Sequence, residues 1–272
     1  MIHFFCALPC EAQPIIQHFK LTELKQFDLF RIYQSKDKQG SLTITGIGKL
    51  NASAAVSYHH ACLNTSADNI WLNVGVAGHA SIQVGEARLI NKITDNQCDS
   101  CWYPQILFKP PCDSTSLLTL DNPSTDYQDA LFDMEASGFY QMALRLGTAE
   151  LIHCLKIISD NNEQPTSTIN ADNVKKMISA HTGTIDSIPD SLKPFATDMA
   201  SIIKEPEHYQ KFIELWHFTQ SERIQLSRLL RQWTVRYPNE DIMQSITDLK
   251  TGKSVLSELK NKLTESEFII YD

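Results

Sequence analysis

Two runs between residues 131 and 160 decide the fold class of this chain. They read Leu131-Phe-Asp-Met-Glu-Ala-Ser-Gly-Phe-Tyr140 and Leu151-Ile-His-Cys-Leu-Lys-Ile-Ile-Ser-Asp160. The first contains a Met-Glu pair that opens an apolar, helix-like run, and the second is a β-branched strand that ends abruptly on Ser-Asp. Ligands of open α/β sheets sit outside the carboxyl ends of strands, so we expect Asp160 at a binding crevice. Glu135, at the start of the helix, is placed to reach the same crevice, and two converging carboxylates predict acid/base chemistry on a polar small molecule.

Strands and helices alternate over the first 160 residues. Apolar runs or alternation predict strands at 2–8, 29–35, 41–47, 69–75, 86–93, 115–120 and 151–158. Helices are predicted over 10–20, 51–62 and 134–147, and residues 36–40 are predicted to form a hairpin turn. This order predicts a three-layer α/β domain whose sheet is covered on both faces.

After Asp160 the pattern becomes helical. The helical segments are 171–181, 191–204, 207–217, 221–236, 241–249 and 254–263. We therefore predict an α/β domain at 1–204 and a C-terminal helical extension at 205–272. Within 221–236, the predicted apolar stripe is Ile224, Leu226, Leu229, Leu230 and Trp233, and the arginines on the remaining surface are Arg223, Arg228, Arg231 and Arg236. Such arginines more often form a solvated helix face than a contact with nucleic acid or an acidic partner.

Composition limits the function classes. The formal net charge of −8 argues against a general binder of nucleic acid or of acidic membranes. No apolar run reaches transmembrane length, and residues 1–6 lack the basic start and small-residue cleavage site of a signal peptide. Seven cysteines suit a reducing cytoplasm better than a disulfide framework. Cys98 and Cys101 supply only half of a zinc site, so we expect free thiols and no metal.

Five segments, taken in order, resemble the nucleoside phosphorylase and nucleosidase superfamily. They are the first strand and its loop at 2–11, the Gly-Ile-Gly-Lys-Leu-Asn-Ala turn at 46–52, the Asn-Val-Gly-Val-Ala-Gly block at 73–78 with Val-Gly-Glu at 84–86, the Met-Glu pair at 134–135 and the Ser-Asp pair at 159–160. Each is weak alone, but together and in order they are a strong match. The resemblance implies a three-layer nucleoside-phosphorylase-like fold with a central mixed sheet, and the superfamily offers no counterpart for the residues from about 205 onward.

Breaking an N-glycosidic bond requires neutralising the departing base, stabilising an oxocarbenium-like sugar and delivering a nucleophile. The resemblance implies that Asp160 is the general acid for a purine nitrogen, that Glu135 holds the ribose hydroxyls and that Glu11 activates water. It also implies a substrate site lined by Met134, Ala77, Gly78, Ser159, Ile47 and Gly48. Without the resemblance, Asp160 would be interpreted as a turn cap and Glu135 as an ordinary acidic residue in a first helical turn.

The choice between hydrolysis and phosphorolysis depends on arginine, which binds phosphate through two hydrogen bonds. Phosphorylases of the superfamily place arginines near the first loop and before the Gly-x-x-Gly block, but residues 8–13 and 69–73 contain none. Glu11 instead matches the acidic residue of the nucleosidases. We therefore predict a purine nucleosidase of the methylthioadenosine/S-adenosylhomocysteine or futalosine hydrolase type, which acts on a nucleoside without a cofactor. The cysteine content predicts a cytoplasmic protein, and the resemblance implies a homodimer. A phosphorylase with a rebuilt phosphate site and a catalytically degenerate nucleoside-binding protein are the alternatives.

The chain departs from the superfamily pattern at three places. Lys156 stands where many members have an arginine, and a long cation in an apolar strand is predicted to pair with Glu135 or Asp160. Segment 95–133 is shorter than its counterpart, and Asp-Asn-Pro at 121–123 replaces a loop that contacts the purine. His79 either lines the crevice or sits satisfied on a loop, and the sequence does not decide between the two.

Overall fold

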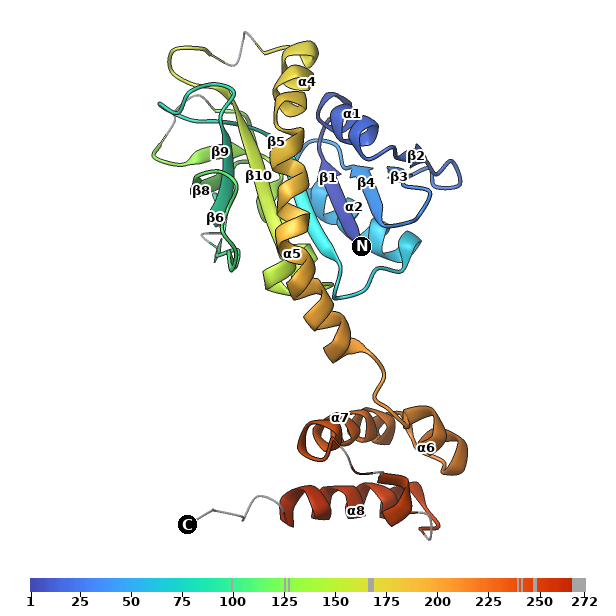
Figure 1. The fold of residues 1–272 in the computed structure, drawn as a ribbon. Helices are drawn as coiled ribbons and strands as arrows, with labels where there is room; N and C mark the ends of the chain where they lie inside the picture. Colours follow the sequence, from blue (N-terminus) through green and yellow to red (C-terminus); the bar gives the residue numbers. More distant parts are fainter. Residues whose placement is uncertain are drawn as a thin grey trace. The chain divides into compact units, whose positions relative to one another are not determined.

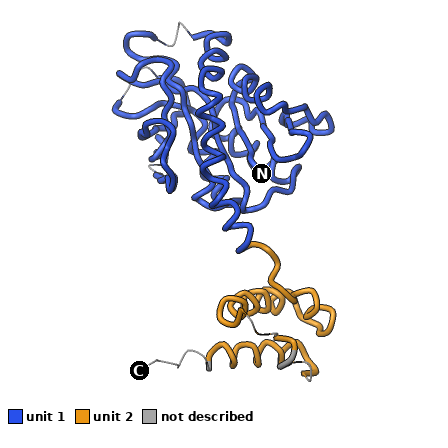
Figure 2. Tube along the Cα trace, viewed as in Figure 1, with its two compact units in different colours: residues 1–202 blue, residues 203–272 orange. Residues whose placement is uncertain are grey.

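The computed structural model describes residues 1–98, 100–124, 126, 128–165, 169–238, 240, 242–246 and 249–265. The chain divides into two compact units, Met1–Ile202 and Ile203–Asp272 (Figure 2). The first unit combines a sheet with helices, whereas the second is built from helices (Figure 1). None of the helices in these ranges is long and apolar enough to cross a bilayer.

One mixed sheet forms the centre of the first unit. Its strands in the described ranges are β1 (Ile2–Cys6), β2 (Thr22–Glu23), β3 (Arg31–Gln34), β4 (Gly40–Ile44), β5 (Ile70–Gly78), β6 (Ala87–Asp95), β7 (Cys101–Trp102), β8 (Ser114–Thr119), β9 (Leu131–Asp133) and β10 (Ile152–Asp160). The order is β10-β6-β8-β9-β5-β1-β4-β3-β2, and β7 pairs with β6. Since β10 also pairs with β5, the strands β5, β10, β6, β8 and β9 close into a ring.

The pairing pattern brings several carboxyl ends of strands to one edge of the sheet. β1 is parallel to β5, and β5 is parallel to β10. The short strand β9 is antiparallel to β5, and its Phe132 pairs with Gly78, the last residue of β5. The same Gly78 pairs with Asp160 at the end of β10. Residues that follow or end these strands are therefore neighbours in space.

Helices cover both faces of the sheet because strand side chains alternate between the faces. Phe4 of β1 packs with α1 (Pro9–His18), α4 (Ala171–Ala180) and α5 (Thr182–Ile203) on one face. Phe5, the next residue, packs with α2 (Lys49–Leu63) and α3 (Ala136–Ala143) on the other. All nine residues of β10 are buried, as expected of a strand with helices on both sides. The predicted three-layer α/β fold with a central mixed sheet is confirmed.

Each of the seven predicted strands is present, and the turn predicted at 36–40 joins the antiparallel pair β3 and β4. The short strands β2, β7 and β9 were not predicted. The helix predicted at 134–147 is shorter, because residues 131–133 pair with β8 and α3 begins only at Ala136. The segment 191–204 is the second part of α5, which continues through Pro189 and Pro194 since Ile185, Ile188 and Leu192 are buried against the core.

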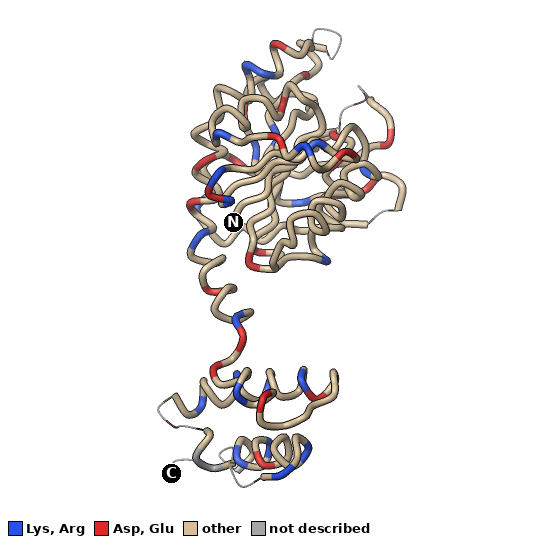
Figure 3. Tube along the Cα trace, turned by 90° about the vertical axis from the view of Figure 1, so that its right-hand side faces the viewer, with Lys and Arg blue, Asp and Glu red and all other residues tan. Residues whose placement is uncertain are grey.

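The C-terminal unit is built from α6 (Tyr209–Leu215), α7 (Gln220–Arg236) and α8 (Gly252–Glu265). The segment 241–249 contains only a 3₁₀ turn, Ile242–Ser245, and its residues 241, 247 and 248 lie outside the described ranges. Leu226, Leu229, Leu230 and Trp233 of α7 are buried in this unit's own core, but Ile224 is 69% exposed, so its assignment to the apolar stripe was wrong. Lys and Arg are interspersed with Asp and Glu along both units (Figure 3).

Each unit packs its own hydrophobic core, and this leads to a prediction for a truncated chain. A chain that ends after Lys204 keeps the sheet, α1 to α5 and both clusters that cover the sheet. We expect it to stay in solution and to unfold in a single cooperative transition, because it loses only the separate core of α6 to α8. Circular dichroism during heating checks this, with the full chain as control. Aggregation of the truncated chain, or a melting curve without a cooperative step, would contradict it.

Candidate functional site

A pocket of about 260 Å³ lies where the carboxyl ends of β1, β5, β9 and β10 meet. Its lining consists of Ala7, Leu8, Glu11, Ile47, Val76, Ala77, Gly78, Leu120, Asn122, Pro123, Ser124, Phe132, Asp133, Met134, Glu135, Ser159, Asp160 and Ile169. Nearly all site residues named from the sequence lie in this lining. The exception is Gly48, whose backbone contacts Glu135. A larger pocket of about 470 Å³ lies at the opposite ends of the strands, against Ile2, Gly40 and Ile70.

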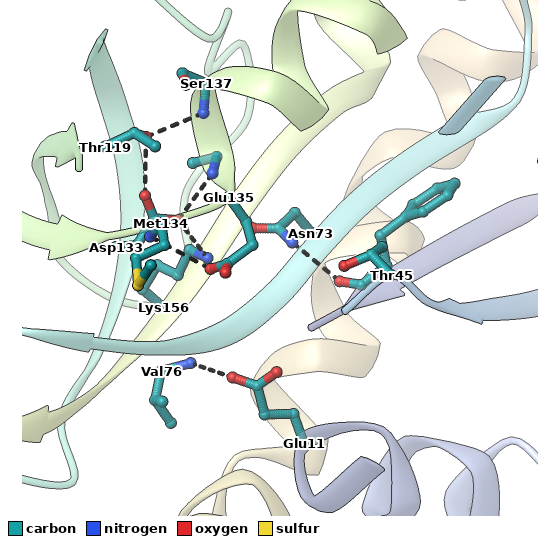
Figure 4. Close-up of polar contacts among 12 residues, drawn as sticks. Glu11, Thr45, Asn73, Val76, Thr119, Asp133, Met134, Glu135, Ser137 and Lys156 are labelled. Atoms are coloured by element: carbon teal, nitrogen blue, oxygen red, sulfur yellow. Dashed lines mark hydrogen bonds and ion pairs between the residues drawn. The ribbon is translucent and has the colours of Figure 1, made fainter. Parts of the chain in front are cut away.

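Glu11 is buried in the first turn of α1 and faces β5 (Figure 4). One carboxylate oxygen accepts a hydrogen bond from the Leu8 amide at 2.9 Å, and the other accepts one from the Val76 amide at 2.9 Å. A Cβ at Gly75 would lie 2.9 Å from the Glu11 Oε1 atom, so glycine is required beneath the carboxylate. Burial raises the pKa of Glu11, against the effect of the Lys156 ammonium and of the backbone amides.

Glu135 is the N-cap residue of α3, and its side chain points toward the start of α2. Its Oε1 atom accepts a hydrogen bond from the Gly48 amide at 2.8 Å. Gly48 has a φ of 101°, a left-handed value that favours glycine, so the turn can present its amide only with a residue lacking Cβ. Burial, together with the negative charge of Asp133, raises the pKa of Glu135 to about 7. The carboxyl group therefore exchanges its proton near neutral pH.

Lys156 pairs with a residue that the sequence interpretation missed. Its ammonium lies 2.8 Å from Asp133 Oδ2, and both side chains are essentially inaccessible to solvent. The predicted pairing with Glu135 or Asp160 was wrong. Burial alone would lower the pKa of Lys156, but the charges of Asp133 and Glu135 outweigh burial and raise it, so the ammonium stays charged.

Asp133 is held from several sides (Figure 4). Thr119 donates its hydroxyl hydrogen to Asp133 Oδ1 at 2.8 Å, and the Ala136 amide donates to Oδ2 at 2.9 Å. The sequence signal that could have identified Asp133 is its position directly before the Met-Glu pair. Its partner lies 23 positions away on another strand, so no local pattern connects the two.

Ser159 and Asp160 both line the pocket although they are consecutive in a strand. The register of β10 on β5 shifts between Ile158 and Asp160, which is a bulge that lets neighbouring side chains turn to the same side. The Ser159 hydroxyl donates a hydrogen bond to the Asp160 carboxylate, and Asp160 itself is buried. The bulge thus aims an acidic group and a hydroxyl into the site.

His79 does not line the pocket, which decides the alternative left open by the sequence. Its Nδ1 atom accepts hydrogen bonds from the amides of Ser81 and Ile82, both at 3.1 Å. Burial lowers the pKa of His79, in agreement with a neutral ring that accepts at Nδ1.

Cys98 and Cys101 are exposed free thiols, and within the described ranges no three His, Cys, Asp or Glu side chains are grouped as metal ligands.

Solved structures of nucleosidases and of futalosine hydrolase have the same fold as this ring of strands. The 5′-methylthioadenosine nucleosidase of Arabidopsis thaliana is 19% identical, with a TM-score of 0.57, over 70% of this chain and 95% of the other. The 5′-methylthioadenosine/S-adenosylhomocysteine nucleosidase of S. pneumoniae is 16% identical, with a TM-score of 0.56, over 70% and 99%. Futalosine hydrolase of Helicobacter pylori is 14% identical, with a TM-score of 0.54, over 70% and 97%.

No protein-family model matches the chain. No curated protein matches it either. At identities this low, the likeness to the solved structures establishes the fold alone. The resemblance recognised in the sequence is confirmed at that level.

Proposed function

We propose that this protein is a purine nucleosidase that hydrolyses the N-glycosidic bond of a purine nucleoside or a 5′-modified nucleoside. The observation that carries the proposal is that Glu11, Glu135 and Asp160 line one pocket. They come from a helix start, a helix cap and a strand end that are far apart in the sequence. Hydrolysis of a glycosidic bond uses an acid for the leaving group and a carboxylate that activates water, and a further carboxylate can stabilise the oxocarbenium-like sugar.

The positions of Glu11 and Asp160 along β5 suit a bound nucleoside. Glu11 lies against Gly75, and Asp160 pairs with Gly78, three residues further along the same strand. Three residues of a strand span roughly 10 Å, which is close to the length of a nucleoside. Asp160 would donate a proton to the departing purine at one end. Glu11 would take a proton from the attacking water at the sugar end, and its two backbone hydrogen bonds fix the direction in which it accepts.

Glu135 would bind the ribose hydroxyls between these two groups. Its carboxylate is oriented by the Gly48 amide, and Met134 beside it offers an apolar surface to the sugar. A carboxylate here favours the positive charge that develops on the ribose. Because the pKa of Glu135 is about 7, ribose binding should strengthen as the pH rises through neutrality.

Hydrolysis is favoured over phosphorolysis by the charges around the pocket. The lining contains carboxylates but no Arg or Lys among the described residues. The buried cation nearby, Lys156, already pairs with Asp133. A phosphate dianion would face the acidic side chains of the described lining, which includes no guanidinium, and this is unfavourable in a low-dielectric site. The superfamily resemblance adds a homodimer to the proposal, and the seven cysteines, which suit a reducing compartment, add a cytoplasmic location.

The full-length protein tests this proposal when it is incubated with adenosine, inosine, 5′-methylthioadenosine, S-adenosylhomocysteine and futalosine, with and without inorganic phosphate. The three solved neighbours named above supply the choice of 5′-modified nucleosides. We expect chromatography to find free base and free sugar from at least one substrate, at a rate that phosphate does not change. Sugar 1-phosphate formed at a rate that rises with phosphate would establish the phosphorylase alternative. No base from any nucleoside would point to a degenerate protein.

A further inference from the structure

Lys49, the first residue of α2, joins three elements near the pocket although the proposed reaction does not use it. Its ammonium lies 3.0 Å from Asp95 Oδ1 at the end of β6 and 2.9 Å from Asp121 Oδ1 in the loop after β8. The Lys49 side chain is only 17% exposed, which separates it from an ordinary surface cation. A cation held by two carboxylates from different elements fixes those elements relative to each other.

The first connection runs to the start of α3. The Ser137 hydroxyl donates to Asp95 Oδ2 at 2.7 Å, so Lys49 and Ser137 share one carboxylate. Burial would raise the pKa of Asp95, but the hydrogen bonds from Ser137 and Gln97 and the Lys49 ammonium lower it to about 2. Asp95 is therefore a permanent anion between the two helix starts.

The two helix starts also touch directly. A Cβ on Gly138 would lie 2.0 Å from the Lys49 carbonyl oxygen, so α3 packs against the backbone of α2 at this residue. Gly48, one residue earlier, donates its amide to Glu135, the cap of α3. The hydrogen bond from Gly48 to Glu135 thus lies between the starts of α2 and α3, which the Lys49–Asp95 ion pair holds together.

The second connection runs to the wall of the pocket. The chain leaves β8 at Leu120, whose amide donates to the Asp133 carbonyl at 2.8 Å. Asp121 follows and binds Lys49, and Asn122, Pro123 and Ser124 then line the pocket. The Lys49–Asp121 ion pair therefore fixes the start of the pocket wall that residues 122–124 form.

We propose that Lys49 is a positioning residue for the nucleosidase reaction proposed above: through Asp121 it holds the pocket wall at 122–124, and through Asp95 it keeps the Gly48 amide on Glu135. The inference rests on the proposed function for its kinetic consequences. It predicts separate effects for the two connections, because one holds a wall of the pocket and the other aligns Glu135, the group proposed to bind the ribose.

The kinetic experiment compares Asp121→Ala and Lys49→Met with a matched control, Lys193→Met, which removes an ion pair with Asp190 whose side chains are 70% and 63% exposed. Asp121→Ala removes only the wall connection and should raise KM about 10-fold with kcat nearly unchanged. Lys49→Met removes both connections and should also lower kcat by about 10-fold or more, since Glu135 loses its alignment. The control should keep both constants. Wild-type KM in Asp121→Ala, or wild-type kcat in Lys49→Met, would overturn the inference.

A second measurement does not require turnover. The Gly48 amide donates to Glu135, so its proton resonance should titrate with that carboxylate in ¹⁵N-labelled full-length protein. We expect a midpoint near pH 7 in the wild type and in Asp121→Ala, and loss of the titration in Lys49→Met. An unchanged titration in Lys49→Met would overturn the link to Glu135. If the wild type releases no base, the proposed function fails, whereas this titration still decides whether Lys49 positions Glu135. If Lys49→Met does not fold, the KM of Asp121→Ala decides.

Discussion

Glu11→Gln should abolish measurable base release while nucleoside binding persists. A glutamine has no carboxylate to take the proton of the attacking water, and loss of a positioned base costs about 10²- to 10⁴-fold in rate. The amide nitrogen also cannot accept a hydrogen bond, so either the Leu8 or the Val76 amide loses its acceptor. We therefore expect a loss of about 1–3 kcal/mol in the free energy of unfolding as well, which leaves the protein folded.

Single-turnover kinetics and isothermal titration with the best nucleoside separate these effects. Glu86→Gln is the matched control, because the Glu86 side chain is 42% exposed and pairs with Arg88 away from the pocket lining. It should behave as the wild type. A Glu11→Gln protein that hydrolyses at more than about one tenth of the wild-type rate would exclude Glu11 as the base, because a positioned base contributes more than that.

Asp160→Asn should slow hydrolysis by about 10²- to 10⁴-fold, the usual contribution of a positioned acid. The carboxyl group is buried at the end of β10, where it accepts the Ser159 hydroxyl hydrogen and lines the pocket. A carboxylic acid can transfer its proton to a purine nitrogen, whereas an asparagine amide offers only a weak donor. The loss should be smallest for 7-methylated purine nucleosides, whose base is already positively charged and leaves without protonation.

The comparison of leaving groups is the decisive measurement, because it distinguishes proton donation from positioning. Asp190→Asn is the control, since the Asp190 side chain is 63% exposed and lies outside the pocket lining. Equal losses on good and poor leaving groups in Asp160→Asn would mean that Asp160 only orients the base. The acid would then have to be another group of the site.

Much of the fold could be predicted because the seven longer strands of the first unit each carry their own sequence signal. The β10 run from Ile152 to Ile158 is apolar except for His153 and Lys156, and both faces of that strand are in fact covered. The strand β9 escaped prediction because three residues are too few to show a period, and only its pairing with β8 and β5 makes it a strand. Likewise, α5 runs through Pro189 because buried contacts outweigh the lost hydrogen bond.

In the candidate site, too, the residues could be named from the sequence, whereas their surroundings depend on tertiary contacts. Glu11, Glu135 and Asp160 were named from motifs and their order, and the structure places all three in one pocket. Their environment was not predictable. The pKa of Glu135 depends on burial and on Asp133, and the bulge that turns Asp160 beside Ser159 depends on the register with β5.

By itself, the sequence determined the alternation of strands and helices, the helical character of the C-terminal unit and the identity of the acidic side chains at the strand ends. These follow from local patterns, because periodicity and turn residues act within a few positions. Only the tertiary structure decided that Lys156 binds Asp133, that Lys49 joins Asp95 to Asp121 and that Ile224 faces solvent. A long side chain can reach many partners, and which carboxylate it meets is set by strand register and helix packing across the whole unit.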